Sequence, residues 1–171
     1  PSDSEDECAD CKDDDEEEWG NFINPFTPSL PMGTRSVTTI EGEDGPLMKI
    51  YKQYDGYVEG GLGESLVEFL KGRRVVNGYS MKDAEERAFN GEGCLAASIV
   101  AHLKEGIGNV YIQPIDDDYE GSYNYFIRVE NGKIYIRMEG FEGVIYDGPV
   151  DDFSLSVVNV WWVKISMLLN A

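Results

Sequence analysis

The sequence predicts an α+β fold, in which an antiparallel sheet, built from an N-terminal hairpin and a C-terminal meander, carries two or three helices packed on one face. Residues 37–51 and 109–146 alternate apolar and polar side chains in short runs divided by turn residues, as strands do. Residues 64–106 instead contain apolar side chains at helical spacing. These helical segments lie together, without the regular strand and helix alternation of a parallel sheet.

The first two predicted strands flank a turn at residues 43–46, Glu-Asp-Gly-Pro. Val37 and Thr39 mark the first strand. In the second strand, residues 47, 49 and 51 alternate with the apolar residues 48 and 50. The pattern predicts a β-hairpin.

Three helices are expected next. Residues 64–72 place Leu66, Phe69 and Leu70 on one face and end in Lys-Gly, which is typical of a short amphipathic helix. Residues 81–89 predict two turns of helix with Ser80 as the N-cap. Residues 94–106 form the most apolar segment of the three and predict a central buried helix.

The remainder of the chain returns to a period of two. Strand-like runs cover residues 109–114, 122–129, 133–138 and 143–146. The Glu-Asn-Gly sequence at 130–132 is a strong hairpin signal, so the runs predict an antiparallel meander.

Composition divides the 171 residues into four parts. Residues 1–18 hold eleven acidic residues and one lysine and predict a disordered tail, because such a segment buries too little apolar surface to offset its ordering entropy. Residues 19–31 form an arm rich in proline and aromatic residues, residues 32–153 a globular domain, and residues 154–171 a hydrophobic C-terminal element.

The arm and the C-terminal element are both too apolar to be plain spacers. Each predicts either packing on its own domain or contact with a partner protein. The partner-binding candidates are aromatic and come from both segments: Trp19, Phe22, Phe26, Trp161 and Trp162.

Charge excludes several classes of partner. The net charge is −19, and outside the tail 22 acidic residues (33 less 11) face 13 basic ones (14 less 1). Direct nucleic-acid binding is therefore not expected, because it needs clustered lysine and arginine.

No run of residues is apolar over the length of a membrane span. An odd cysteine count and an acidic start favour a reducing intracellular compartment or a virion over secretion, although the location stays open.

The loop at residues 53–64 carries the densest group of polar, aromatic and glycine residues. Asp55, Glu59 and Glu64 could act as acid and base or hold a cation, and the glycines would let backbone approach a ligand. The alternative is a glycine-rich turn that caps the following helix. The candidate ligand-binding residues stand at element ends beside glycines: Arg35, Gln53, Asp55, Tyr57, Asn77 and Asn90.

No catalytic residue, metal site or cofactor is predicted. Cys94 stands at a helix start, where a thiolate would be stabilised, but it is expected to be a small core residue. His102 lies eight residues later, about 12 Å along the same helix, too far for a cysteine–histidine pair. It is expected to be hydrogen-bonded and partly buried. The two cysteines at 8 and 11 are too few ligands for a structural zinc site, and the acidic run at 116–118 predicts a solvated turn.

Four short motifs resemble a family of small uncharacterised proteins encoded largely by bacteriophages and other viruses. They occupy residues 32–36 (MGTRS), 54–57 (YDGY), 89–96 (FNGEGCLA) and 146–149 (YDGP), and the resemblance covers residues 32–153. Family members often begin at MGTRS and carry a Tyr- or Trp-Asp-Gly-Tyr element. The resemblance implies a viral or mobile-element origin and no activity.

Three functions are compatible with these features. The first is a non-enzymatic viral or phage-type interaction protein, a component of a particle or large assembly, whose arm and C-terminal element hold partner proteins or mediate self-assembly. The second is a small-molecule-binding or hydrolytic domain with a pocket around Asp55, Tyr57, Asn90 and Cys94. The third is an acidic nucleic-acid mimic that occupies a basic partner.

Overall fold

The computed structural model describes residues 33–158 and confirms the α+β fold. A six-stranded sheet has the strand order β5-β2-β1-β6-β7-β8, and a separate pair joins β3 to β4. In chain order, the elements are β1 (Ser36–Gly42), β2 (Gly45–Lys52), α1 (Leu62–Leu70), β3 (Val75–Val76), α2 (Met81–Glu85), β4 (Phe89–Asn90), α3 (Gly91–Leu103), β5 (Val110–Gln113), β6 (Tyr123–Glu130), β7 (Lys133–Gly140), β8 (Gly143–Pro149) and the short 3-10 helix η1 (Val150–Asp152).

The sheet is mostly antiparallel, as the two predicted hairpin regions require. β1 pairs with β2, and β6, β7 and β8 form the meander. The prediction that β5 belongs to the meander is wrong, because β5 pairs with β2 at the other edge of the sheet. The two regions meet through β1 and β6, which run parallel. Gly121 permits this junction, because a Cβ there would lie 2.5 Å from the Cα of Ser36, and β6 therefore starts directly beside the start of β1.

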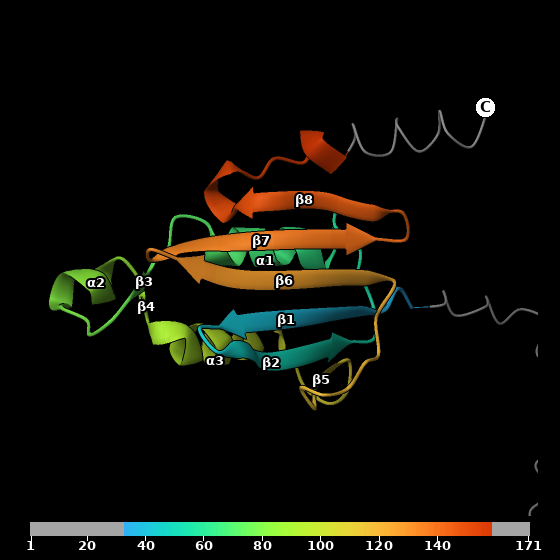
Figure 1. Ribbon diagram of the computed structural model, residues 1–171, viewed down its shortest axis with the longest axis horizontal. Coiled ribbons are helices and arrows are strands. Elements are labelled where there is room, and N and C mark those ends of the chain that lie inside the picture. The colour runs from blue at the N-terminus through green and yellow to red at the C-terminus, as the bar shows by residue number, and fades with distance from the viewer. Residues whose placement is uncertain (1–32, 159–171) are drawn as a thin grey trace, which may run out of the picture. The chain divides into compact units, whose positions relative to one another are not determined.

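Two helices cover one face of the sheet. Figure 1 shows α1 and α3 behind the strands, and their apolar residues belong to the same buried cluster as those of the sheet. In that cluster, Leu66 of α1 and Ile99 of α3 are both completely buried. Helix α2 contributes no buried residue, so it is not part of this layer.

Helix α2 still begins where its cap predicts. The Ser80 side chain accepts a hydrogen bond from the N–H of Asp83, and the Asp83 carboxylate accepts one from the N–H of Ser80. This reciprocal capping box satisfies two donors that a helix start otherwise leaves unbonded.

The prediction that Cys94 is a core residue is wrong. Cys94 is exposed, whereas the buried residues of α3 include Leu95, Ala96 and Ile99. Successive helix residues are rotated by about 100°, so the position before Leu95 leaves the buried face. Within the described residues, no helix is both long enough and apolar enough to cross a membrane.

Candidate functional site

The loop between β2 and α1 is held against the sheet by backbone and side-chain hydrogen bonds. The N–H of Gly56 donates to the carbonyl of Thr34 at 2.8 Å, and the N–H of Leu62 donates to the carbonyl of Asp55 at 2.8 Å. The buried hydroxyl of Tyr125, in β6, donates to the carbonyl of Gly56 at 2.7 Å. The loop is therefore a fixed part of the fold.

Two of the glycines in this loop are required by close packing. A Cβ on Gly56 would lie 2.7 Å from the side chain of Ser36, and one on Gly61 would lie 2.5 Å from the carbonyl oxygen of Tyr57. Real Cβ atoms do not approach other atoms this closely. Packing of the loop on β1 and on itself therefore accounts for these glycines without a ligand.

Two non-glycine residues near the loop have left-handed backbone conformations. Asp55 has φ 55° and Asn109 has φ 60°. Asn109 is held by the end of β2, since its carbonyl accepts from the N–H of Gln53 at 2.8 Å and its Oδ1 accepts from the N–H of Tyr54 at 3.1 Å. Such conformations are uncommon outside glycine, and they gather at functional sites.

Asp55 and Asn109 line a cavity of about 470 Å³, which we call the Asp55 pocket. Its walls come from the β2–α1 loop, from α1, from the C-terminal end of α3 and from the segment before β5. The lining residues are Lys52, Asp55, Tyr57, Gly60, Gly61, Leu62, Ser65, His102, Leu103, Glu105 and Asn109.

A serine and a histidine meet in this pocket. Ser65 Oγ of α1 lies 3.0 Å from His102 Nε2 of α3. The imidazole also stacks on the ring of Phe69, with centroids 4.2 Å apart and planes at 10°. The predicted hydrogen bond of His102 is thus present, but the residue is exposed, because Leu103 takes the buried position at this end of α3.

Charges of both signs line the Asp55 pocket. Lys52 Nζ donates a hydrogen bond to the carbonyl of Tyr54. Partial burial lowers the pKa of Lys52, while the nearby carboxylates of Asp55 and Glu105 act in the opposite direction. The hydroxyl of Tyr57 lies 3.5 Å from Asp55 Oδ1, a long contact that leaves the carboxylate open to another donor.

Helix α1 offers no anion site at its start. The N–H groups of Leu62, Gly63 and Glu64 donate to backbone carbonyls of the preceding loop at 2.8–3.2 Å. A helix start usually leaves such donors for a cap, water or an anionic ligand. Here they are already bonded, so they form neither a phosphate cradle nor an oxyanion hole.

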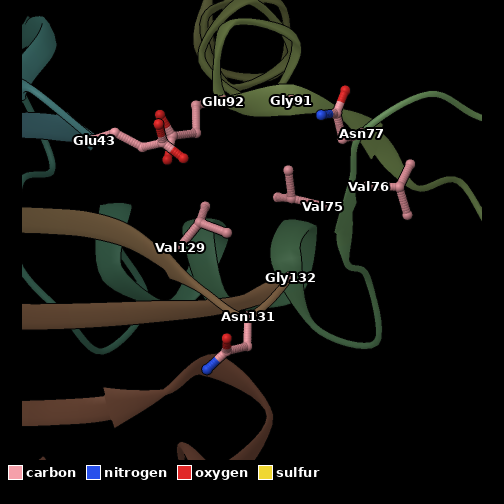
Figure 2. Close-up of a pocket in the computed structure, with 9 residues that line it drawn as sticks. All are labelled: Glu43, Val75, Val76, Asn77, Gly91, Glu92, Val129, Asn131 and Gly132. Carbon is pink, nitrogen blue, oxygen red and sulfur yellow. The ribbon is translucent and has the colours of Figure 1, made fainter.

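A second cavity, of about 540 Å³, lies at the other end of α3. Figure 2 shows the carboxylates of Glu43 and Glu92 pointing toward one another on one side of it, with Val75 and Val129 nearby. Asn77 also lines this cavity. The start of α3, at Gly91 and Glu92, forms part of the wall.

The structure thus divides the predicted ligand-binding residues. Asp55 and Tyr57 share the Asp55 pocket, and the N–H of Gln53 helps to hold its wall. Asn77 lines the second cavity, and Asn90 lies beside it, where its Oδ1 accepts from the N–H of Gly78 at 2.8 Å.

Helix α3 separates the two cavities. It has 13 residues and is therefore about 20 Å long. Cys94 and Asn90 lie at its N-terminal end, whereas His102 lines the Asp55 pocket at its C-terminal end. Asn90 and Cys94 therefore do not complete a site with Asp55.

Arg35 belongs to neither cavity. A hydrogen bond with Tyr119 is the main cause that raises the pKa of Arg35, and Tyr51 adds to it. Tyr119 also packs edge-on against Tyr51, with ring centroids 5.6 Å apart. Tyr119 thus attaches the β5–β6 loop to β2 through its contact with Tyr51.

Sequence reasoning missed most of the Asp55 pocket. Ser65 and His102 are 37 positions apart, and neither carries a local motif. The one usable signal is for Asn109, which stands between glycine and a strand, where a left-handed residue is common.

Several predicted residues lie outside the described part of the chain. These are the cysteines at 8 and 11 and the partner-binding candidates Trp19, Phe22, Phe26, Trp161 and Trp162. Within residues 33–158, no group of three or more histidine, cysteine or acidic side chains is arranged to hold a metal ion.

No protein-family model, curated protein or solved structure matches the chain. The chemistry of the Asp55 pocket is therefore the ground on which a function can be proposed.

Proposed function

We propose that this chain is a non-enzymatic binding protein whose globular part holds a small polar group in the Asp55 pocket. One observation carries the proposal. Charged and hydrogen-bonding side chains from four separate segments, namely Asp55, Ser65, His102 and Asn109 among others, converge on one cavity of about 470 Å³. Ligand sites are typically concave, largely preformed and supplied with a few convergent polar groups.

The rigidity of the walls supports the proposal. Asp55 has a left-handed conformation, and its carbonyl accepts a hydrogen bond from the N–H of Leu62, which begins α1. The next residue, Gly56, is held by the hydroxyl of Tyr125. A wall that is already ordered loses little conformational entropy when a ligand binds.

A thermal-shift screen with a library of small polar compounds tests this function. Asp55→Asn removes the charge and keeps a residue that tolerates the left-handed conformation. Asp116→Asn is the matched control, because Asp116 is an exposed acidic residue of the β5–β6 loop and does not line the pocket. We expect compounds that stabilise the wild type and Asp116→Asn but not Asp55→Asn. Identical shifts in all three proteins would count against the pocket.

The contact between Ser65 and His102 favours one second candidate, an esterase. In that reaction Ser65 Oγ would attack an ester carbon while His102 Nε2 takes the hydroxyl proton, the alcohol would leave with that proton, and water would then hydrolyse the acyl-serine. Within residues 33–158, however, no carboxylate bonds the second nitrogen of His102, and the first N–H groups of α1 are occupied.

Hydrolysis of p-nitrophenyl acetate separates the two functions. A binding protein predicts equal rates of p-nitrophenol release by the wild type and Ser65→Ala. A burst that requires Ser65 would favour the esterase.

The two ends of the chain extend the binding role. We propose that the arm at 19–31 and the element at 154–171, whose first residues pack on the domain through the buried Val158, contact partner proteins in a particle or another large assembly. The apolar composition of both segments supports this, and the resemblance to phage-encoded and virus-encoded proteins supports a viral origin. A polyanion-mimic role for residues 1–18 predicts partner binding that weakens strongly with salt.

A further inference from the structure

We infer that the Asp55 pocket binds a primary alkylammonium group, carried either by a free amine or by a lysine side chain. The inference rests on the proposed function and names the chemical class of its ligand. Four features of the pocket support it.

The first feature is the balance of fixed charges. Two carboxylates, of Asp55 and Glu105, line the pocket against one ammonium, that of Lys52. Lys52 Nζ already donates to the carbonyl of Tyr54. An added cation would therefore neutralise an excess of negative charge, whereas an added anion would increase it.

The second feature is that the backbone donors in the first turn of α1 are already bonded. The four N–H groups at the start of α1 are bonded to the carbonyls of Asp55, Tyr57, Val58 and Gly61. The N–H of Gly60 donates to Glu64 Oε2 at 2.7 Å. An anionic ligand would meet bonded donors here, while an ammonium group needs acceptors.

The third feature is the orientation of α3. This helix ends at Leu103, which lines the pocket together with His102. The last turn of a helix carries partial negative charge on its carbonyl groups, and cations are favoured near it.

The fourth feature is the pairing of Asp55 with an aromatic ring. Tyr57 lines the same wall and is 36% exposed, so its ring is accessible to a ligand. An ammonium group beside a carboxylate and over a tyrosine ring gains from both, because the ring face is electron-rich.

The inference is tested by titrating the full chain with four probes and measuring the NMR chemical-shift changes of its backbone amides. The probes are n-pentylamine, Nα-acetyl-lysine N-methylamide, its Nε-acetylated form, which has lost the charge, and Nα-acetyl-glutamate N-methylamide, which is anionic. We expect the first, the second or both to shift the amides of Asp55, Tyr57, His102 and Glu105, and the two uncharged or anionic probes to leave them in place. A preference for the lysine amide would identify a polypeptide ligand, a preference for n-pentylamine would identify a free amine, and equal binding would show that the alkylammonium group alone is recognised.

Variants locate the binding. Asp55→Asn and Glu105→Gln should each weaken amine binding at least about tenfold, which is the loss of one hydrogen bond to a charged group. Asp116→Asn should leave the affinity unchanged. Shifts of the same amides by the glutamate amide alone would overturn the ligand class and leave the proposed function standing. Amine binding that survives in both pocket variants would overturn the inference, and the absence of any pocket shift with any probe or library compound would overturn the proposed function as well.

Discussion

The hydroxyl of Tyr125 donates a hydrogen bond of 2.7 Å to the carbonyl of Gly56 and so joins the first half of β6 to the loop that carries Asp55. Both residues are buried, and Tyr125 is fully so. This bond explains how a loop with several glycines can form a fixed wall of a pocket. It also makes the pocket wall dependent on a residue 69 positions away in the chain.

Tyr125→Phe should lower the free energy of unfolding by about 1–3 kcal/mol, because it leaves a buried carbonyl without its donor while keeping the aromatic ring. Urea unfolding measures the change. Tyr79→Phe is the control, since Tyr79 is 67% exposed and should change the stability little. Equal stability of the Tyr125 variant and the wild type would show that the bond contributes nothing.

Tyr125 also predicts a loss of stability in alkaline solution. Burial raises the pKa of Tyr125 well above its ordinary value of 10.0. Above pH 10 the unfolded chain therefore releases the Tyr125 proton while the folded protein keeps it. This difference lowers the free energy of unfolding as the pH rises above 10 and has no effect below pH 10. Between pH 9 and pH 11, the free energy of unfolding should decline less in Tyr125→Phe than in the wild type. Parallel curves for the two proteins would contradict this.

Two glycine substitutions should have opposite effects. Gly61→Ala should destabilise the fold and disturb the pocket, because the new Cβ would lie 2.5 Å from the carbonyl oxygen of Tyr57. Gly93→Ala meets no atom within 4 Å in α3 and should stabilise the protein by up to about 1 kcal/mol through helix propensity. Urea midpoints compare the two variants, and a stabilised Gly61→Ala would show that the loop packs differently.

The cap of α2 predicts a titration in acid. The hydrogen bond from the Ser80 side chain is the main cause that lowers the pKa of Asp83 from 3.8 to about 2, and Arg74 makes a smaller contribution. The stabilisation from Asp83 is therefore present above pH 3.8 and is lost as the pH falls toward 2. The carboxyl carbon of Asp83, followed by NMR, should titrate closer to 3.8 in Ser80→Ala. Arg74→Gln should raise the pKa of Asp83 less than Ser80→Ala does, and the reverse order would contradict the role of the cap.

Deletion of residues 1–31 tests the role of the arm. We expect the truncated chain to lose partner capture or incorporation into an assembly. In a second variant, the acidic residues at 13–18 are replaced by their amides. This variant should keep its partner binding if the aromatic residues are responsible, and should lose the salt-dependent part of that binding if the acidic residues are. Unchanged association of the truncated chain would exclude the arm.

Local patterns in the sequence were sufficient to predict the layers of the fold. The Asn131-Gly132 turn predicted the hairpin of β6 and β7, and both residues have positive φ, as such a turn requires. Ser80 predicted the start of α2. The parallel pairing of β1 with β6 could not be predicted, because it depends on the path of the loop at Gly121 and not on any periodicity.

The Asp55 pocket was predictable only in part. Asp55 and Tyr57 stand in one loop, and the many polar, aromatic and glycine residues of that loop indicated a candidate ligand site. Ser65, His102 and Glu105 join them through the packing of α1 and α3 on the sheet, a relationship that leaves no mark in the local sequence. Asn90 and Cys94 failed to join because they occupy the other end of α3.

The most direct test of the Asp55 pocket is a crystal structure of the full chain grown with Nα-acetyl-lysine N-methylamide. We expect the ammonium group within hydrogen-bond distance of the Asp55 carboxylate, beside Tyr57 and the C-terminal end of α3. An empty Asp55 pocket in crystals saturated with the amide, or the amide bound elsewhere with Asp55 uninvolved, would contradict the claim that this pocket is the binding site.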